Sequence, residues 1–244
     1  MKYLKFLLVT IAFSVVSFTR AQNFDNVTIT TTKLSDNVYM LVGAGGNIGV
    51  SVGDDGVFVI DDQFAPLTTK IEAAIKTLSD KQIQFLVNTH YHGDHTGGNE
   101  NMKKLGTTII AHDNVRKRLE DKPKDALPVI TFNDELSLHI NGEKISVFHV
   151  EHAHTDGDAL LYFTKSNVLH TGDVYFNKRY PYIDLNSGGS VNGYIEAVKK
   201  GLSAINDDTK IIPGHGELST KAEYQFFLKM LSCFFRPFNI TFVC

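Results

Sequence analysis

The sequence predicts an α/β protein with a four-layer αβ/βα sandwich, in which two mixed β-sheets pack on each other and carry helices on their outer faces. Two observations predict this fold. Strands followed by helices occur in the first half of the chain, and the same order returns in the second half. The chain has 244 residues, which is enough to bury a full core. We see no linker, low-complexity tract or sequence repeat after residue 21, so residues 22–244 are expected to form one domain.

The first half begins with a meander of short apolar runs and Gly-rich turns, among which GDDG at 53–56 is a tight hairpin signal. Apolar residues at helical spacing, such as Ile71 and Ile75, then predict a helix that leads into the short apolar strand IQFLVN. The expected elements are strands over 38–42, 48–52 and 57–60, a helix over 67–80, a strand over 83–88, a helix over 99–105 and a strand over 107–111.

The second half repeats this order. Thr220 and Glu223 have the spacing of a capping box, which predicts the start of the last helix. The expected elements are strands over 136–140, 144–150, 159–164 and 167–172, a helix over 191–205, a strand over 209–213 and a helix over 220–231. Loops at one edge of two sheets packed in this way are expected to meet in a shared cleft.

Metal-binding side chains gather directly after the strand IQFLVN, in the segment NTHYHGDHTGG at 88–98. His90 and His92 are two residues apart and project to the same side of an extended chain, so both can bind one cation. Asp94 and His95 follow a bend and can face a second cation beside the first. The chain has only ten histidines, and four ligand-type residues within six positions predict a metal site.

Further ligand candidates occur at three later places, each where an apolar strand gives way to a Gly-rich loop. They are the segments HAHTDGD at 152–158, LHTGDVYF at 169–176 and IPGHGE at 212–217. Together with the preceding segment and Asp61 at the end of VFVID, they resemble the metallo-β-lactamase superfamily, whose five motifs run Asp, HxHxDH, His, Asp, His. The resemblance covers essentially all of the chain after residue 21.

The resemblance assigns a role to each matching residue. The first metal ion is implied to bind His90, His92 and His154, the second to bind Asp94, His95 and His215, and Asp173 to bridge them. Asp61 is implied to orient ligands rather than to bind metal. His154 is preferred to its neighbours because HTDG matches the third motif. The remaining histidines are interpreted as structural or surface residues: His112, His139, His149, His152 and His170.

Nitrogen and carboxylate ligands without sulfur suit zinc, although a bridging aspartate also accepts iron or manganese. We therefore expect two Zn²⁺ ions per chain. Two adjacent cations lower the pKa of a shared water toward neutrality and polarise a substrate carbonyl, so the bridging hydroxide can attack the carbonyl carbon. Asp94 is expected to be the catalytic residue that positions the hydroxide or accepts its proton. The predicted activity is metal-dependent hydrolysis of a lactam, thioester or lactone.

The resemblance leaves the substrate open, because this superfamily contains several reaction types on one fold. Lactamases with a cysteine ligand would have Cys at Asp173 and commonly Lys at Phe176, which disfavours that group. Three alternatives to a β-lactamase-like hydrolase stay open: a glyoxalase II-type thioesterase, a mononuclear iron dioxygenase that acts on a persulfide, and a non-catalytic metal-binding module.

The segment FNKRYPYIDLNSGGSVNGYI at 176–195 follows the bridging acid and is expected to overhang the metal ions. Its Lys178, Arg179, Tyr180 and Tyr182 are candidates for binding an anionic, partly apolar small molecule. The alternative is that this segment is a packed connection between a strand and a helix.

The first 21 residues predict export. Lys2 and Lys5 precede an apolar run from Phe6 to Phe18, and Ala21 is a small residue at the expected cleavage position. The run is short for a membrane span. We therefore expect a cleaved signal peptide and a periplasmic or secreted protein without a membrane-spanning segment, with an uncleaved anchor as the alternative.

Charge and cysteine content narrow the classes of partner. Without residues 1–21 the chain has 21 basic and 27 acidic residues, a net charge of −6, which argues against a nucleic-acid partner. The two cysteines, Cys233 and Cys244, are too few for a disulfide framework or a cysteine-rich metal site, although a disulfide between these two residues stays a possibility.

The tail at 233–244 is unusually apolar for the superfamily. Truncation, a reading-frame artefact and a buried end are the three explanations that stay open.

Overall fold

The computed structural model describes residues 23–234. The predicted signal peptide at 1–21 and the segment 235–244, which includes Cys244 and most of the atypical tail, lie outside the described residues. Cys233, at the end of the described part, is exposed and has a free thiol there.

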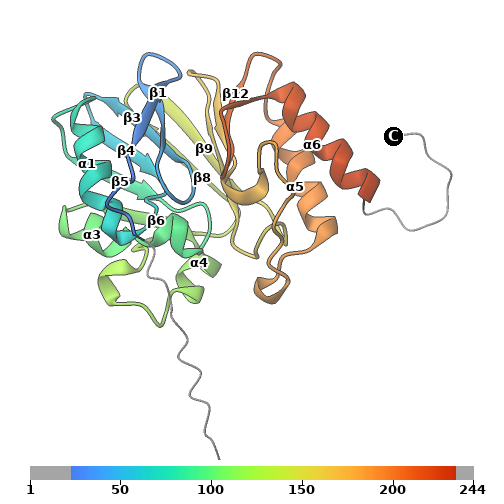
Figure 1. The fold of residues 1–244 in the computed structure, drawn as a ribbon, viewed down its shortest axis with the longest axis horizontal. Helices are drawn as coiled ribbons and strands as arrows, with labels where there is room; N and C mark the ends of the chain where they lie inside the picture. Colours follow the sequence, from blue (N-terminus) through green and yellow to red (C-terminus); the bar gives the residue numbers. More distant parts are fainter. Residues whose placement is uncertain (1–22, 235–244) are drawn as a thin grey trace, which may run out of the picture.

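Two β-sheets lie face to face in the middle of the molecule (Figure 1). On the outer side of the first sheet lie α1 (Thr68–Lys76) and α3 (Asn99–Lys104), and on the outer side of the second lie α5 (Val191–Ser203) and α6 (Lys221–Phe234). The predicted four-layer sandwich is therefore confirmed.

The first sheet has seven strands in sequence order, antiparallel from β1 to β4 and parallel from β4 to β7. The strands are β1 (Thr30–Lys33), β2 (Val38–Val42), β3 (Ile48–Gly53), β4 (Gly56–Ile60), β5 (Ile83–Val87), β6 (Thr108–His112) and β7 (Ile130–Phe132). Two short helices, α2 (Gly93–Thr96) and α4 (Asp113–Arg118), follow β5 and β6.

The second sheet has six strands in the order β13-β12-β11-β10-β9-β8. It is antiparallel except for the pair β11 and β12. The strands are β8 (Glu135–Ile140), β9 (Glu143–His149), β10 (Ala159–Phe163), β11 (Val168–His170), β12 (Lys210–Ile212) and β13 (Ser219–Thr220).

Apolar side chains hold the four layers together at three interfaces. Between the sheets, Phe58 of β4 meets Phe163 of β10 edge to face, with ring centroids 6.0 Å apart. Ile71 of α1 is buried against the outer side of the first sheet, and Tyr194 of α5 and Phe227 of α6 are buried against the second. Central strands such as β4 are thus buried on both faces, as their continuous apolar sequence indicates, whereas the edge strands β1 and β8 are partly exposed.

Each helix and strand expected from the sequence is present. The strand over 38–42 has the expected ends, and the ends of the others are shifted. The predicted capping box is confirmed, because Glu223 accepts from the backbone N–H of Thr220 while Thr220 accepts from that of Glu223. The helix expected over 67–80 ends earlier, at Lys76. The strands β1, β7 and β13 and the helices α2 and α4 were not expected from the sequence. The three strands have only two to four residues each, which is too few for a clear alternation of apolar and polar residues, and all residues of β1 are exposed.

Two parallel strand pairs bring their carboxyl ends to one edge of the sandwich. Ile60 of β4 pairs with Val87 of β5, and His170 of β11 pairs with Ile212 of β12. The loops that leave these four strands are therefore neighbours. The loop between β9 and β10, which carries HAHTDGD, lies at the same edge, because β9 ends and β10 begins beside the end of β11. Within residues 23–234, none of the helices combines the length and apolar character that crossing a membrane requires.

Candidate metal centre

The first histidines of the site lie in the segment that follows β5. The N–H of Asn88 donates to Ile110 of β6, the chain bends over 89–91, and α2 begins at Gly93. His90 and His92 therefore precede α2, and Asp94 lies within it. A bend after the strand is present as predicted, but it begins before His90 and not at Gly93.

Three histidines converge in the first ligand group. His92 Nδ1 lies 3.1 Å from His90 Nε2 and 2.8 Å from His154 Nε2. His154 comes from the loop between β9 and β10, and both His154 and His90 are fully buried. Three imidazole nitrogens that face one point form a site suited to zinc or another borderline cation.

The second group lies beside the first. His95 Nε2 and His215 Nε2 are 3.5 Å apart, and Asp94 Oδ2 is 3.3 Å from His215 Nε2 and 3.8 Å from His95 Nε2. His215 lies just after β12. Ligand atoms of these three residues come within 4.8 Å of one another, and the same holds for Asp173 with the three histidines of the first group.

Asp173 lies between the groups and directs one carboxylate oxygen to each. Its Oδ2 is 3.5 Å from His154 Nε2 and 3.8 Å from His90 Nε2, whereas Oδ1 is 3.1 Å from His95 Nε2 and 3.4 Å from His215 Nε2. Oδ1 is also buried without a hydrogen-bond partner among the described residues. A buried, unpartnered carboxylate oxygen facing imidazole nitrogens is what a resident cation would satisfy, so the residues present fit a two-metal site.

Asp61 holds the second group in place. Its Oδ2 accepts from His95 Nδ1 at 2.7 Å and from the hydroxyl of Thr89 at 2.8 Å, and its Oδ1 accepts from the backbone N–H of Thr89. Because Nδ1 of His95 carries this proton, Nε2 is left facing the ligand group. Asp61 has a left-handed backbone at φ 61°, a strained conformation for a residue with a side chain, and this fits a residue held for function.

The first group is oriented by the loop after β11. His154 Nδ1 donates to the backbone carbonyl of Tyr182 at 2.7 Å, and His92 Nε2 donates to Asp184 Oδ2 at 3.1 Å. Tyr91 also donates to Asp184 Oδ2, at 2.8 Å, and sits beneath the guanidinium of Arg118. Asp184 was not predicted as a site residue, because no motif contains it and its only sequence signal is its position in the loop that follows Asp173.

We expect Asp184→Asn to lower metal affinity of the first group by about 10- to 100-fold, because the asparagine still accepts from His92 but supplies no charge to raise its basicity. Chelator competition at fixed pH measures the affinity. Asp134→Asn, at a carboxylate outside both groups, is the matched control. Equal affinity in Asp184→Asn and the parent protein would show that Asp184 has no such role.

The two groups differ in the protonation of their histidines. Burial and neighbouring histidines lower the pKa of His90 well below its ordinary value, and the pKa of His92 is also lowered, mainly by burial. Burial acts in the same direction on His215, but Asp173 and Asp94 outweigh it and raise its pKa to about 9. Burial is likewise outweighed at His95, where Asp173 and Asp61 raise the pKa well above its ordinary value.

The four candidate substrate residues separate into two places. Lys178, Arg179 and Tyr180 line a cavity of about 600 Å³ against α6, together with apolar residues such as Phe226, and not the metal groups. Lys178 also pairs with Glu217 at 2.7 Å. Tyr182 is different, because its ring lies 5.6 Å from that of His154 and 6.1 Å from that of His92.

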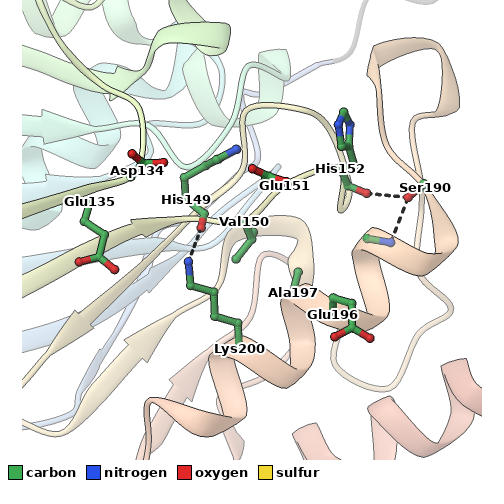
Figure 2. A pocket seen from close by; sticks show the side chains of 11 residues that line it. Asp134, Glu135, His149, Val150, Glu151, His152, Ser190, Glu196, Ala197 and Lys200 are labelled. Atoms are coloured by element: carbon green, nitrogen blue, oxygen red, sulfur yellow. Dashed lines mark hydrogen bonds between the residues drawn. The ribbon is translucent and has the colours of Figure 1, made fainter.

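The remaining histidines lie apart from both ligand groups. His149 and His152 line a separate cavity of about 500 Å³ between the end of β9 and α5 (Figure 2). His149 stacks on His112, with ring centroids 3.9 Å apart. His170 is buried in β11, where Nε2 donates to the carbonyl of Asn47 and Nδ1 accepts from Gly172 N–H, as a structural histidine does. His139 is exposed on β8.

Gly214 leaves room for the bridging carboxylate. A Cβ at this position would lie 2.1 Å from Asp173 Oδ1 and 2.6 Å from the backbone of Gly172. Gly214→Ala is therefore expected to displace Asp173 and to lower turnover about 100-fold, with reduced metal content. Metal analysis of the purified variant measures the second effect, with Gly93→Ala as control, since a Cβ there meets nothing within 4 Å. Parent-like metal content and rate in Gly214→Ala would contradict this.

Two ligand groups that share one carboxylate, at the edge of an αβ/βα sandwich, define a protein with a dinuclear-type metal site. The model of the Metallo-beta-lactamase superfamily matches residues 41–215, and the chain belongs to this superfamily. This confirms the family expected from the five motifs.

Individual relatives and a solved structure agree with that assignment. The chain is 30% identical over 155 residues to hydroxyacylglutathione hydrolase of Pelagibacter ubique (strain HTCC1062), covering 60% of this chain and 58% of that protein. It is 20% identical over 207 residues to metallo-beta-lactamase type 2 of Bacillus cereus, covering 80% and 79%. The structure of a metallo-beta-lactamase from Pontibacter korlensis superposes with a TM-score of 0.75 at 18% identity, over 84% of this chain and 99% of that one. The chain thus spans less than two thirds of the length of the hydroxyacylglutathione hydrolase.

Proposed function

We propose that this protein is an exported dinuclear zinc hydrolase that cleaves a carbonyl bond in a lactam, thioester or lactone. The observation that carries the proposal is the position of Asp173, whose two oxygens each face a different group of imidazole ligands. A carboxylate placed in this way would help to hold a cation in each group, and a pair of cations would supply activation of a water and of a substrate carbonyl. The names of the relatives, a β-lactamase and a thioester hydrolase, support the same bond class.

When bound, a pair of metal ions lowers the pKa of a shared water and polarises the carbonyl under attack. The chain supplies the base. Burial raises the pKa of Asp94, but the hydrogen bond with His215 and the charge of His95 outweigh it and leave the pKa below its ordinary value. Asp94 is therefore ionised at neutral pH, and its carboxylate at the edge of the second group is placed to accept a proton from the attacking water.

Zinc is proposed over iron or manganese because the six ligands other than Asp173 include five imidazoles and no sulfur. A mononuclear iron centre with dioxygenase activity would need only one group, and the complete second group of Asp94, His95 and His215 favours two metal ions. Export is proposed from residues 1–21, and the amino-terminal sequence of the protein recovered from a periplasmic extract or the medium tests it.

The test of the function combines metal analysis with a substrate panel. About two zinc ions per chain and chelator-sensitive hydrolysis of nitrocefin, a thioester or a lactone are expected. His92→Ala should lose turnover and metal, whereas His139→Ala, at an exposed histidine outside both groups, should keep both. One iron per chain with no hydrolysis would overturn the proposal in favour of an oxygenase, and two metals without turnover would indicate a binding module.

A further inference from the structure

An aromatic wall borders the two ligand groups. The ring of Phe176 lies parallel to that of His215, with centroids 5.2 Å apart, and meets the ring of His154 edge-on at 6.1 Å. Its backbone is tied to the same ligand by a β-bridge between Phe176 and His215, and the N–H of Asn177 donates to the carbonyl of His215. A buried apolar ring therefore occupies the place beside a ligand of each group.

Tyr182 extends this wall toward solvent. Its backbone carbonyl is fixed by the hydrogen bond from His154, while its side chain is 58% exposed and packs near the rings of His154 and His92. An anchored backbone with an exposed aromatic ring is suited to contact a molecule that approaches the two ligand groups. We call Phe176 and Tyr182 the aromatic corner.

The basic residues near the aromatic corner pair with other side chains or line another cavity. Lys178 is paired with Glu217, and it lines the α6 cavity with Arg179. Arg118 forms two hydrogen bonds with Asp156, at 2.6 and 2.7 Å. The ionised side chain nearest to Tyr182 in sequence is Asp184, an anion already bonded to His92. Of the lysine and arginine side chains near the corner in the described residues, Lys178 and Arg179 thus line the α6 cavity and Arg118 is held by Asp156, which leaves none of these three assigned to a substrate carboxylate.

We propose that the aromatic corner selects substrates whose group next to the scissile carbonyl is uncharged and apolar, preferably aromatic, over substrates that carry a carboxylate there. This inference rests on the proposed hydrolase function and names its substrate class. An aromatic group gains contact with Tyr182 and Phe176, whereas a carboxylate in the same place loses water without gaining a partner. This proposal differs from the anionic ligand expected from Lys178 and Arg179, which line the α6 cavity.

Two matched pairs of compounds test the inference. Phenylacetyl and succinyl thioesters of one thiol compare turnover, and phenylacetamide and succinamate compare binding to the metal-loaded protein by calorimetry. We expect kcat/KM to favour the phenylacetyl thioester by at least about 10-fold, and phenylacetamide to bind more tightly than succinamate by a similar factor.

Tyr182→Ala should reduce both preferences, largely through KM, whereas Phe226→Ala, at an exposed aromatic residue on α6, should leave them unchanged. Phe176→Lys, with metal content confirmed, should shift the preference toward the succinyl compounds. Equal or stronger binding and turnover of the succinyl compounds would overturn the inference, as would an unchanged preference in Tyr182→Ala. A binding preference without hydrolysis of either thioester would support the aromatic corner and overturn the proposed hydrolase function instead.

Discussion

Replacement of Asp173 by alanine is expected to reduce turnover by at least about 10³-fold, because among residues 23–234 it removes the one carboxylate that faces both ligand groups. The imidazoles of His90, His92 and His154 would keep a first metal ion, although more weakly. His95 and His215 would lose the anion that raises their pKa values, and the second ion would have Asp94 as its sole charged ligand. We therefore expect metal content to fall from about two ions per chain toward one.

Metal analysis and initial rates on the same purified sample measure both effects. Asp208→Ala, at an exposed aspartate in the turn before β12, is the matched control and should keep both properties. Circular dichroism establishes that Asp173→Ala still folds. A variant that retains two metal ions and most of its activity would show that the second group does not depend on the shared carboxylate.

Metal binding to the second group is expected to weaken steeply as the pH falls. The pKa of His215 is raised to about 9 and that of His95 is raised well above its ordinary value, so in the metal-free protein both are protonated at pH 7. A metal ligand must be neutral, so each binding event releases these protons, and the affinity falls about tenfold per pH unit for each proton released. His90 and His92, with lowered pKa values, are already neutral at pH 7. The first group should therefore load at a lower pH than the second.

Calorimetry in buffers with different ionisation enthalpies counts the protons released, and chelator competition at pH 6 and pH 8 measures the affinities. Between these values the second affinity should change by about 10⁴-fold if both histidines release a proton, or by about 100-fold if one does, and the first affinity by much less. Asp61→Asn should lessen the pH dependence, because Asp61 is one of the anions that raise the pKa of His95. Two affinities with the same pH dependence would contradict the assignment.

Much of the candidate site was predictable because its ligands lie next to strand ends. The segment at 88–95 follows an apolar strand, and the segments around Asp173 and His215 do the same, so residue type and local position together mark them. Asp184 was not predictable. Its role depends on a contact with His92, which is 92 residues away in sequence, and on a loop whose path no periodicity records.

In the loop at 176–190, too, the sequence identified candidate substrate residues but not which of them lie at the site. Lys178, Arg179, Tyr180 and Tyr182 are equivalent candidates by composition, but only Tyr182 lies beside the ligand groups. The backbone carbonyl of Tyr182 is held by His154, whereas the preceding residues pass over α6. Long-range hydrogen bonds such as the one from His154 decide which side of a loop a side chain occupies. A sequence pattern does not contain this information.

Sequence pattern indicated the order of the layers and the segments that carry ligand-type residues, because strand and helix periodicity and the spacing of metal-binding residues are local properties of the chain, and the resemblance to the superfamily assigned the individual ligands. The pairing of β4 with β5 and of β11 with β12, the orientation of Asp173 between two groups, and the contrast between protonated and neutral histidines were decided only by the folded structure. Distances of a few ångströms between segments far apart in sequence set hydrogen bonding, burial and charge interactions, and these are what determine metal binding and pKa.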